Sequence, residues 1–330
     1  MAHGINIQEK TMITINTNPS LVFVYLGKLP DYAKYSLILN SRYNKIVLLC
    51  DTNFEYSIPN VDVISIKLFY KSNLFIDLAD NSTKNFRDGF WSKTIERFYV
   101  LMAYMKYYNI KSLFHGEIDN LIFSLEKMPY YLNKLGSGLF YPKLNDKIAA
   151  ASLMYINSIK ELELMCTYFN EQKSFKDDMQ MLAEYFEYSQ NVFQLPSENN
   201  LSDDLPMYVE NEKCIFDVAS FGQYLFGIDL RNSLRPIFNK YQNVHCRTDL
   251  SKIKFRINEI SNEFYLQNNG QEFKVINLHI HSKIFKKICC DNKFVLKIVN
   301  KLNNGTSTLI SINVRNYKFI RNIFSYINSF

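Results

Sequence analysis

Short apolar runs alternate with helical patterns along the first half of the chain, and this alternation restricts the fold more than any other feature. Apolar runs at residues 21–26 and 45–50 have the length of buried strands, and residues 61–66 (VDVISI) alternate and predict a third strand. Residues 31–43 and 91–108 carry apolar side chains at helical spacing. Strands that alternate with helices form mainly parallel sheets with right-handed crossovers. The sequence therefore predicts an α/β fold with a Rossmann-like, mainly parallel sheet flanked by helices.

A fourth predicted strand, at residues 111–123, contains two carboxylates. Glu117 and Asp119 stand two residues apart in the run FHGEIDNLIF, directly after Gly116. Side chains at positions i and i+2 of a strand point the same way, so both acids could face one cation or its water shell. Mg²⁺ is held in this way by one or two carboxylates plus substrate phosphates. An isolated pair of this kind is more often an exposed turn, and the apolar flanks shift the interpretation toward a metal site.

Three further residues are candidates for the same edge of the sheet. Ligands of parallel sheets bind beyond the carboxyl ends of the strands. Gly27 and Asp51 follow the first two predicted strands, so they could line one cleft with the acids. Arg97 lies on the helix before the acidic strand and could bind a diphosphate or ribose, because its fork suits phosphate oxygens. By spacing alone, a surface salt bridge is the favoured role for Arg97.

The second half of the chain is less regular. Its sequence predicts helices at residues 158–170 and 175–189, a polar connecting loop at 194–206 and a late strand at 274–281. Residues 149–156 are either another strand or the start of a helix. On that late strand, His279 and His281 share one face. An imidazole could complete a metal site built on carboxylates, and Lys283 could neutralise a phosphate. The alternative is a pair of ordinary strand histidines bonded to backbone.

The segment FDVASFGQYLFGIDLRN, residues 216–232, combines acids with two glycines. Asp217 or Asp229 could act as a general base, and Gln223 could orient a hydroxyl. Helix capping is an equally weighted role for the aspartates. Its glycines indicate tight turns or close approach around an apolar element.

Three blocks of this sequence resemble glycosyltransferases with the GT-A fold. Residues 89–123 (GFWSKTIERFYVLMAYMKYYNIKSLFHGEIDNLIF) resemble the donor-binding half, in which a helix precedes a strand that ends in a DxD-type motif. That motif is here Glu117-Ile118-Asp119, with Glu in place of the first Asp. Residues 216–232 and 277–283 (NLHIHSK) resemble blocks of bacterial and viral putative glycosyltransferases of this kind. The similarity covers residues 20–285 in the order of elements.

The resemblance implies roles for individual residues. Asp119 would ligate the metal directly, and Glu117 would contact the ribose, the metal or its water. His279 or His281 would join the metal, and Lys283 would contact the donor diphosphate. The metal would be Mn²⁺ or Mg²⁺.

The resemblance also implies an activity, which is transfer of a sugar from a nucleotide-sugar donor, a UDP- or GDP-sugar, to an acceptor hydroxyl. That hydroxyl would belong to a glycan or to a protein- or lipid-linked acceptor, and both inversion and retention at the anomeric carbon fit the sequence. We expect donor binding by residues 15–145, acceptor binding and catalysis by 146–285, and a basic extension at 286–330. A metal-dependent nucleotidyltransferase is one alternative, and a non-catalytic sugar-nucleotide-binding protein on the same fold is another.

Motifs of other enzyme classes are missing from the sequence. There is no GxGxxG after the first predicted strand, no GxxxxGK[ST] and no GxSxG, so dehydrogenase, P-loop and hydrolase interpretations lack support. The six cysteines form no CxxC pair, which favours reduced thiols in a cytoplasmic protein. No run of 18 apolar residues exists, so no spanning helix is expected.

The net charge of +6 is concentrated at the C-terminal end. Six basic residues and no acid follow Asp291, and they stand among apolar and aromatic residues. One interpretation is peripheral contact with an anionic membrane. A terminal helix packed on the domain, with a solvated basic face, is favoured by a modest margin. No recognition motif for nucleic acid accompanies the charge.

Overall fold

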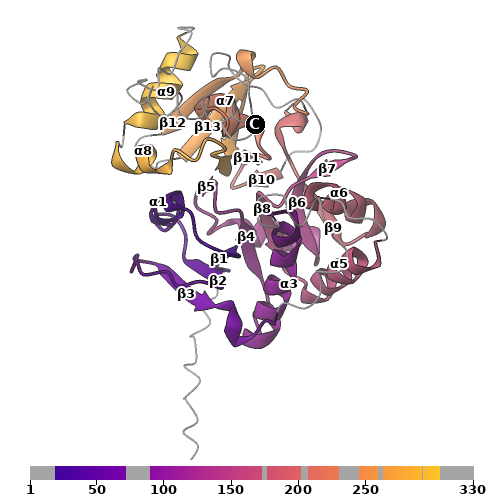
Figure 1. Ribbon diagram of the computed structural model, residues 1–330. Helices are drawn as coiled ribbons and strands as arrows, with labels where there is room; N and C mark the ends of the chain where they lie inside the picture. Colours follow the sequence, from indigo (N-terminus) through magenta and orange to yellow (C-terminus); the bar gives the residue numbers. More distant parts are fainter. Residues whose placement is uncertain are drawn as a thin grey trace, which may run out of the picture.

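The computed structural model describes residues 19–71, 90–172, 177–201, 207–229, 245–258, 263–291 and 293–304. Within these ranges the strands form three sheets of eight, five and two strands. The large sheet and its helices make up the indigo-to-mauve part of Figure 1, and the five-stranded sheet lies in the orange part with α8 and α9 beside it.

The large sheet has the order β3-β2-β1-β4-β8-β6-β7, with β9 paired to β6. Its strands are β1 (Leu21–Tyr25), β2 (Ile46–Cys50), β3 (Val61–Ser65), β4 (Leu113–Gly116), β6 (Leu139–Asn145), β7 (Ile148–Ala149), β8 (Leu153–Ile156) and β9 (Val192–Leu195). Strands β1 to β4 pair in parallel, as do β6 and β9, whereas β8 runs antiparallel to both β4 and β6. The predicted α/β class with a mainly parallel sheet is thereby confirmed.

Helices cover both faces of this sheet. They are α1 (Asp31–Asn40), α3 (Phe90–Tyr108), α4 (Met128–Leu135), α5 (Ile159–Glu171) and α6 (Asp178–Tyr188), with the short turn η1 (Ile66–Leu68) after β3. Apolar residues of α3, α5 and α6 pack on one face, and those of α1 and α4 on the other. Such two-sided cover explains why β1 and β2 are continuous apolar runs.

The second half contains the five-stranded sheet, with the order β10-β11-β14-β13-β12. Its elements are β10 (Met207–Val209), β11 (Glu212–Ile215), α7 (Ser220–Phe226), η4 (Leu250–Lys252), β12 (Lys254–Asn258), β13 (Glu263–Asn268), β14 (Gln271–Val275), α8 (Phe285–Cys290) and α9 (Phe294–Asn303). The expected boundary between residues 145 and 146 falls between the paired strands β6 and β7, so the large sheet crosses it. The three-part division of the chain remains a prediction.

Two predicted strands are wrong in their extent. The expected strand at residues 111–123 ends at Gly116, and a separate strand, β5, spans Asn120–Ile122. The expected strand at 274–281 likewise divides into β14 and β15 (Asn277–His279). Strands β5 and β15 pair with each other, antiparallel, to form the two-stranded sheet. After β4 the chain leaves the eight-stranded sheet, and after β14 it leaves the five-stranded sheet. The pair formed by β5 and β15 joins the two halves of the molecule.

The polar loop expected at residues 194–206 is also more structured than its composition indicates. It contains the end of β9 and the turn η2 (Glu198–Asn200), and both Ser197 and Glu198 are fully buried. The Glu198 carboxylate accepts hydrogen bonds from the backbone of residues 218–220, which explains why an acid can be buried here. Residues 202–206 lie outside the described ranges.

The described part of the basic C-terminal segment is helical and packed. Ile298 and Val299 of α9 are buried against the domain, while Lys293 and Lys297 are exposed. Helix α9 fits the favoured interpretation of a packed terminal helix with a solvated basic face. The basic residues after Asn304 lie outside the described residues.

Candidate metal and diphosphate site

Three candidate ligands meet where the two halves join. Glu117 and Asp119 lie in the turn between β4 and β5, and His279 is the last residue of β15. One ligand atom from each of the three residues lies within 4.8 Å of the others. The turn is closed by the Asn120 N–H, which donates to the Glu117 carbonyl at 2.9 Å, and it buries Ile118 between the two acids. A turn at the end of a parallel strand, rather than a continuous strand, therefore brings the acids together.

The backbone fixes the orientation of the His279 ring. Its Nδ1 lies 3.0 Å from the Val218 carbonyl oxygen, which only accepts, so Nδ1 carries the proton. Nε2 is left to face Asp119 Oδ2 at 3.2 Å. Burial lowers the pKa of His279, but the Asp119 carboxylate overrides this effect and raises it to about 9. A carbonyl bonded to the rear nitrogen is the usual support of a metal-binding histidine.

Lys283 forms an ion pair with Asp119. Burial alone would raise the pKa of Asp119, but Lys283 and His279 hold it well below its usual range. Lys283 also has a positive φ of 59°, and its ammonium lies over the Tyr32 ring at 5.7 Å from the centroid. The predicted cation for a phosphate thus lies beside the predicted metal ligand.

Arg97 is buried in the wall of the site. Its Nη1 donates to Glu117 Oε1 at 2.8 Å, and its Nη2 is paired with Asp178. Burial opposes the charge of Arg97, but Glu117 and Asp178 raise its pKa above the ordinary value. Burial also raises the pKa of Asp178 to about 6, against the opposing effect of Arg97. Arg97 makes the salt bridge that its spacing favoured, but in the interior instead of at the surface.

Asp217 binds backbone N–H groups in the first turn of α7, although Ala219 occupies the N-cap position itself. It is fully buried and accepts backbone hydrogen bonds from Phe221 at 2.9 Å, Gly222 at 2.8 Å and His279 at 2.9 Å. The first two bonds satisfy N–H groups in the first turn of α7, and the third holds β15. Burial and the nearby Glu198 raise the pKa of Asp217 to about 7.

Three other predicted site residues lie outside the cluster of Glu117, Asp119 and His279. They are Gln223, Asp229 and His281. Gln223 is buried on α7, and its Oε1 has no hydrogen-bond partner among the described residues. The Asp229 N–H donates to His281 Nδ1 at 2.9 Å, so the proton of a neutral His281 is on Nε2. Burial, together with His279, lowers the pKa of His281 to about 4. Of the two predicted histidines, the structure brings only His279 to the carboxylates.

Gly27 and Asp51 meet beyond the carboxyl ends of β1 and β2. The Gly27 N–H donates to Asp51 Oδ1 at 2.8 Å, and Thr52 Oγ1 donates to the Gly27 carbonyl at 3.1 Å. Sequence reasoning missed Lys93, whose Nζ would lie 3.3 Å from a Cβ placed on Gly27. Its signal was present, because Lys93 stands four residues before Arg97 and so shares its face of α3.

Buried asparagines connect the segments that carry the ligands. Asn277 Nδ2 donates to Asn120 Oδ1 at 2.8 Å and to the Asp217 carbonyl at 2.9 Å. The Asp217 N–H donates back to Asn277 Oδ1 at 3.1 Å. Asn40 of α1 donates in turn to the Asn120 carbonyl at 2.9 Å. These bonds fix β5, β15 and the start of α7 relative to one another. No sequence pattern predicted them.

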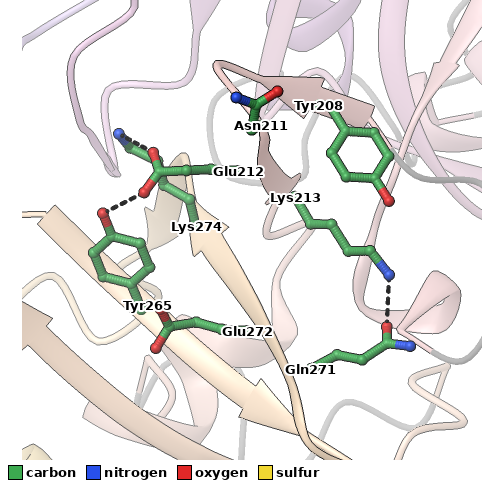
Figure 2. A pocket seen from close by; sticks show the side chains of 8 residues that line it. All are labelled: Tyr208, Asn211, Glu212, Lys213, Tyr265, Gln271, Glu272 and Lys274. Atoms are coloured by element: carbon green, nitrogen blue, oxygen red, sulfur yellow. Dashed lines mark hydrogen bonds and ion pairs between the residues drawn. The ribbon is translucent and has the colours of Figure 1, made fainter.

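A surface hollow of about 330 Å³ lies elsewhere, among the strands β10, β11, β13 and β14. Figure 2 shows its polar lining, in which Glu212 contacts Tyr265 and Lys274 while Lys213 contacts Gln271. None of its lining residues belongs to the predicted site. We place the candidate chemistry at the carboxylate–histidine cluster, where charged groups converge, rather than in this hollow.

Fold and site together define an α/β protein with a carboxylate–histidine cluster beyond a strand of a mainly parallel sheet. No family model and no curated protein matches the chain. Within the described residues, no helix is long and apolar enough to span a membrane.

Solved glycosyltransferase structures show partial similarity. Mouse xyloside xylosyltransferase 1 in its apo form is 9% identical, over 54% of this chain and 85% of that one, with a TM-score of 0.35. The galactosyltransferase LgtC in complex with donor and acceptor sugar analogs is 16% identical, over 53% and 73%, with a TM-score of 0.33. The glycosyltransferase GlyE of Streptococcus pneumoniae TIGR4 is 14% identical, over 55% and 45%, with a TM-score of 0.33. Identities and TM-scores are low, and these similarities assign no function to the chain.

Proposed function

We propose that this protein is a glycosyltransferase that uses a nucleotide-sugar donor and a divalent metal ion. One observation carries the proposal: His279 converges with Glu117 and Asp119 within 4.8 Å, although about 160 residues separate it from the two acids in the sequence. Their convergence lies beyond the carboxyl end of β4, where ligands of parallel sheets bind. Lys283 adds a cation at the same place, which suits a diphosphate.

The donor set fits Mn²⁺ or Mg²⁺. Two carboxylates and one imidazole are hard or borderline ligands, and the Val218 carbonyl leaves Nε2 of His279 free of its proton once the ring is neutral. Asp119 and His279 would be the direct ligands, and Glu117 would reach the ion or its water through the oxygen that Arg97 leaves free. A bound metal would neutralise the charge that develops on the leaving nucleoside diphosphate.

Lys283 would bind the donor diphosphate. In this structure its ammonium is paired with Asp119. A carboxylate that ligates a cation attracts the lysine ammonium less strongly, so the ammonium is then available to phosphate oxygens. Gly27, Asp51 and Lys93 would bind the remainder of the donor at the ends of β1 and β2.

The acceptor hydroxyl would be activated from the second half of the chain. Asp217 is fully buried and holds three backbone N–H groups, so we give it a positioning role. Asp229 is partly exposed and becomes the first candidate for a general base, with Gln223 as a group that orients a hydroxyl. The acceptor would be a glycan or a glycan-bearing molecule.

A donor-hydrolysis screen tests the proposal. UDP-, GDP-, CMP- and dTDP-sugars are incubated with the protein and Mn²⁺, and free nucleotide is measured with and without EDTA. We expect metal-dependent release from one donor class and its loss in Asp119→Asn. Asp146→Asn, which alters a side chain that is 99% exposed, is the matched control and should retain full activity.

A thermal-shift series separates the alternatives. A donor at about 100 times its dissociation constant should stabilise the protein by about 2.7 kcal/mol. Stabilisation without release or transfer would favour a non-catalytic binding protein, and pyrophosphate release from a nucleoside triphosphate and a sugar phosphate would indicate a nucleotidyltransferase. No shift with any donor in the presence of Mn²⁺ would contradict the proposal.

A further inference from the structure

The guanidinium of Arg97 bridges two carboxylates that come from different elements. Glu117 belongs to the turn after β4, and Asp178 is the first residue of α6. Exposed fractions of the side chains are 8% for Arg97, 23% for Glu117 and 5% for Asp178. Glu117 is thus the member of the three that opens toward the site, and Asp178 lies behind the arginine.

Each terminal nitrogen of Arg97 has a different carboxylate partner. Nη1 donates to Glu117 Oε1 at 2.8 Å, while Nη2 is paired with Asp178 Oδ2. Glu117 Oε2 is left facing the cluster, 4.0 Å from the His279 ring. An arginine and a carboxylate that meet without a competitor commonly form two parallel hydrogen bonds, which occupy both carboxylate oxygens. Asp178 is the competitor that prevents this arrangement here.

We propose that Asp178 is a positioning residue for the metal site, and that it acts by keeping Arg97 on a single oxygen of Glu117. With Asp178 in place, Oε1 is anchored and Oε2 remains available to a divalent cation or its water. Without Asp178, the guanidinium turns to hold both oxygens of Glu117 and withdraws Oε2 from the cluster. The inference rests on the proposed function, because it assumes that Glu117, Asp119 and His279 bind a metal ion.

The length of Glu117 fits this role. A glutamate has one methylene more than an aspartate, so one oxygen can reach back to Arg97 on α3 while the other stays beside His279. The glutamate that departs from the DxD pattern is thereby explained by its second partner. Burial makes the arrangement stable, because a buried arginine must have both of its terminal nitrogens paired.

Mn²⁺ affinity of the full chain tests the inference, and it is read as loss of the free-ion EPR signal when Mn²⁺ alone is titrated with the protein. We expect Asp178→Ala to weaken Mn²⁺ binding about tenfold, the lower end for residues that support a metal ligand. Asp178→Asn keeps an oxygen that can accept from Arg97, so it should recover part of the affinity. Asp177→Ala removes the N-cap of the same helix without touching Arg97, and it should leave the affinity unchanged.

A double-mutant cycle separates positioning from a purely structural role. If Asp178 acts through Glu117, then Asp178→Ala should cost little further Mn²⁺ affinity in a Glu117→Gln background. Equal affinity of wild type and Asp178→Ala, or an additive loss in the Glu117→Gln background, would overturn the inference while leaving the proposed function intact. Failure of the wild type itself to bind Mn²⁺ would overturn both.

Discussion

Replacement of Gly222 by alanine tests how closely α7 and β15 must approach for the cluster to form. A Cβ on Gly222 would lie 2.0 Å from the His279 carbonyl oxygen and 2.6 Å from its carbonyl carbon. Both contacts are with backbone, so no side-chain rotation relieves them. Ordinary contact begins at 3.4 Å, and the separation must therefore grow by about 1.4 Å, the difference from 2.0 Å. His279 is the residue that would move.

The expected loss of stability follows from three contributions. Overpacking costs about 2 kcal/mol. The shift also weakens the bonds that Asp217 accepts from Gly222 and His279, which costs about 2 kcal/mol more. Alanine is the better helix former and offsets about 1 kcal/mol. The net loss is about 3 kcal/mol, or about 4 °C in Tm for a chain of this size.

The loss of metal binding should be larger than this loss of stability indicates. Metal–ligand distances tolerate changes of about 0.2 Å, far less than the displacement that Gly222→Ala imposes on His279. Mn²⁺ affinity should fall by about tenfold or more. Urea unfolding followed by circular dichroism measures the first effect, and Mn²⁺ EPR titration measures the second.

Gly270→Ala is the matched control for this prediction. Gly270 has a φ of 78° and no heavy atom within 4 Å of an added Cβ, so alanine there costs only conformational strain of about 1 kcal/mol. It should lower stability and leave Mn²⁺ affinity unchanged. Wild-type Mn²⁺ affinity in Gly222→Ala would refute the assignment of His279 as a ligand held by this contact.

Two further substitutions test the neighbours of the cluster. Lys283→Met removes the ammonium that now pairs with Asp119, so it should weaken binding of a nucleoside diphosphate about tenfold without weakening Mn²⁺ binding; isothermal titration calorimetry measures both, and unchanged diphosphate affinity would contradict the role of Lys283. Asn277→Leu removes a side chain that bonds both Asn120 and Asp217, and it should cost about 3 kcal/mol in urea unfolding. A loss below about 1 kcal/mol would show that these bonds do not hold the two halves together.

The first three strands were predictable because their sequence patterns depend only on neighbouring residues. Residues 21–25, 46–50 and 61–65 are strands within one residue of the predicted limits. The first two are apolar runs that fit buried parallel strands, and the third has the alternating pattern of a partly exposed strand. The antiparallel position of β8, between β4 and β6, was not predictable. Strand order depends on which apolar faces meet in space, and the sequence of an apolar strand does not indicate which strand lies beside it.

The site was predictable in its residues more than in its geometry. Glu117, Asp119 and His279 were named from their types and spacing, but the premise of one continuous acidic strand was wrong. Asn120 and Asn277 determine where the strands break, because their side chains bond each other across the join of the two halves. Asp178 carried no signal, since an acid in the first turn of a helix is ordinary in any sequence.

Several buried polar atoms without a hydrogen-bond partner belong to residues on the elements around this join. In the part of the chain that the structure describes, they belong to Arg97, His115, Asn120, Ser152, Ser220, Gln223 and Ser282. Arg97 bonds Glu117, the Ser152 carbonyl accepts from the Glu117 backbone, and α7 packs on His279. Native structures contain few such atoms, and each lowers stability. Buried polar atoms of this kind are usually paired by an ordered water, so these positions are where water or a polar ligand is expected next to the cluster.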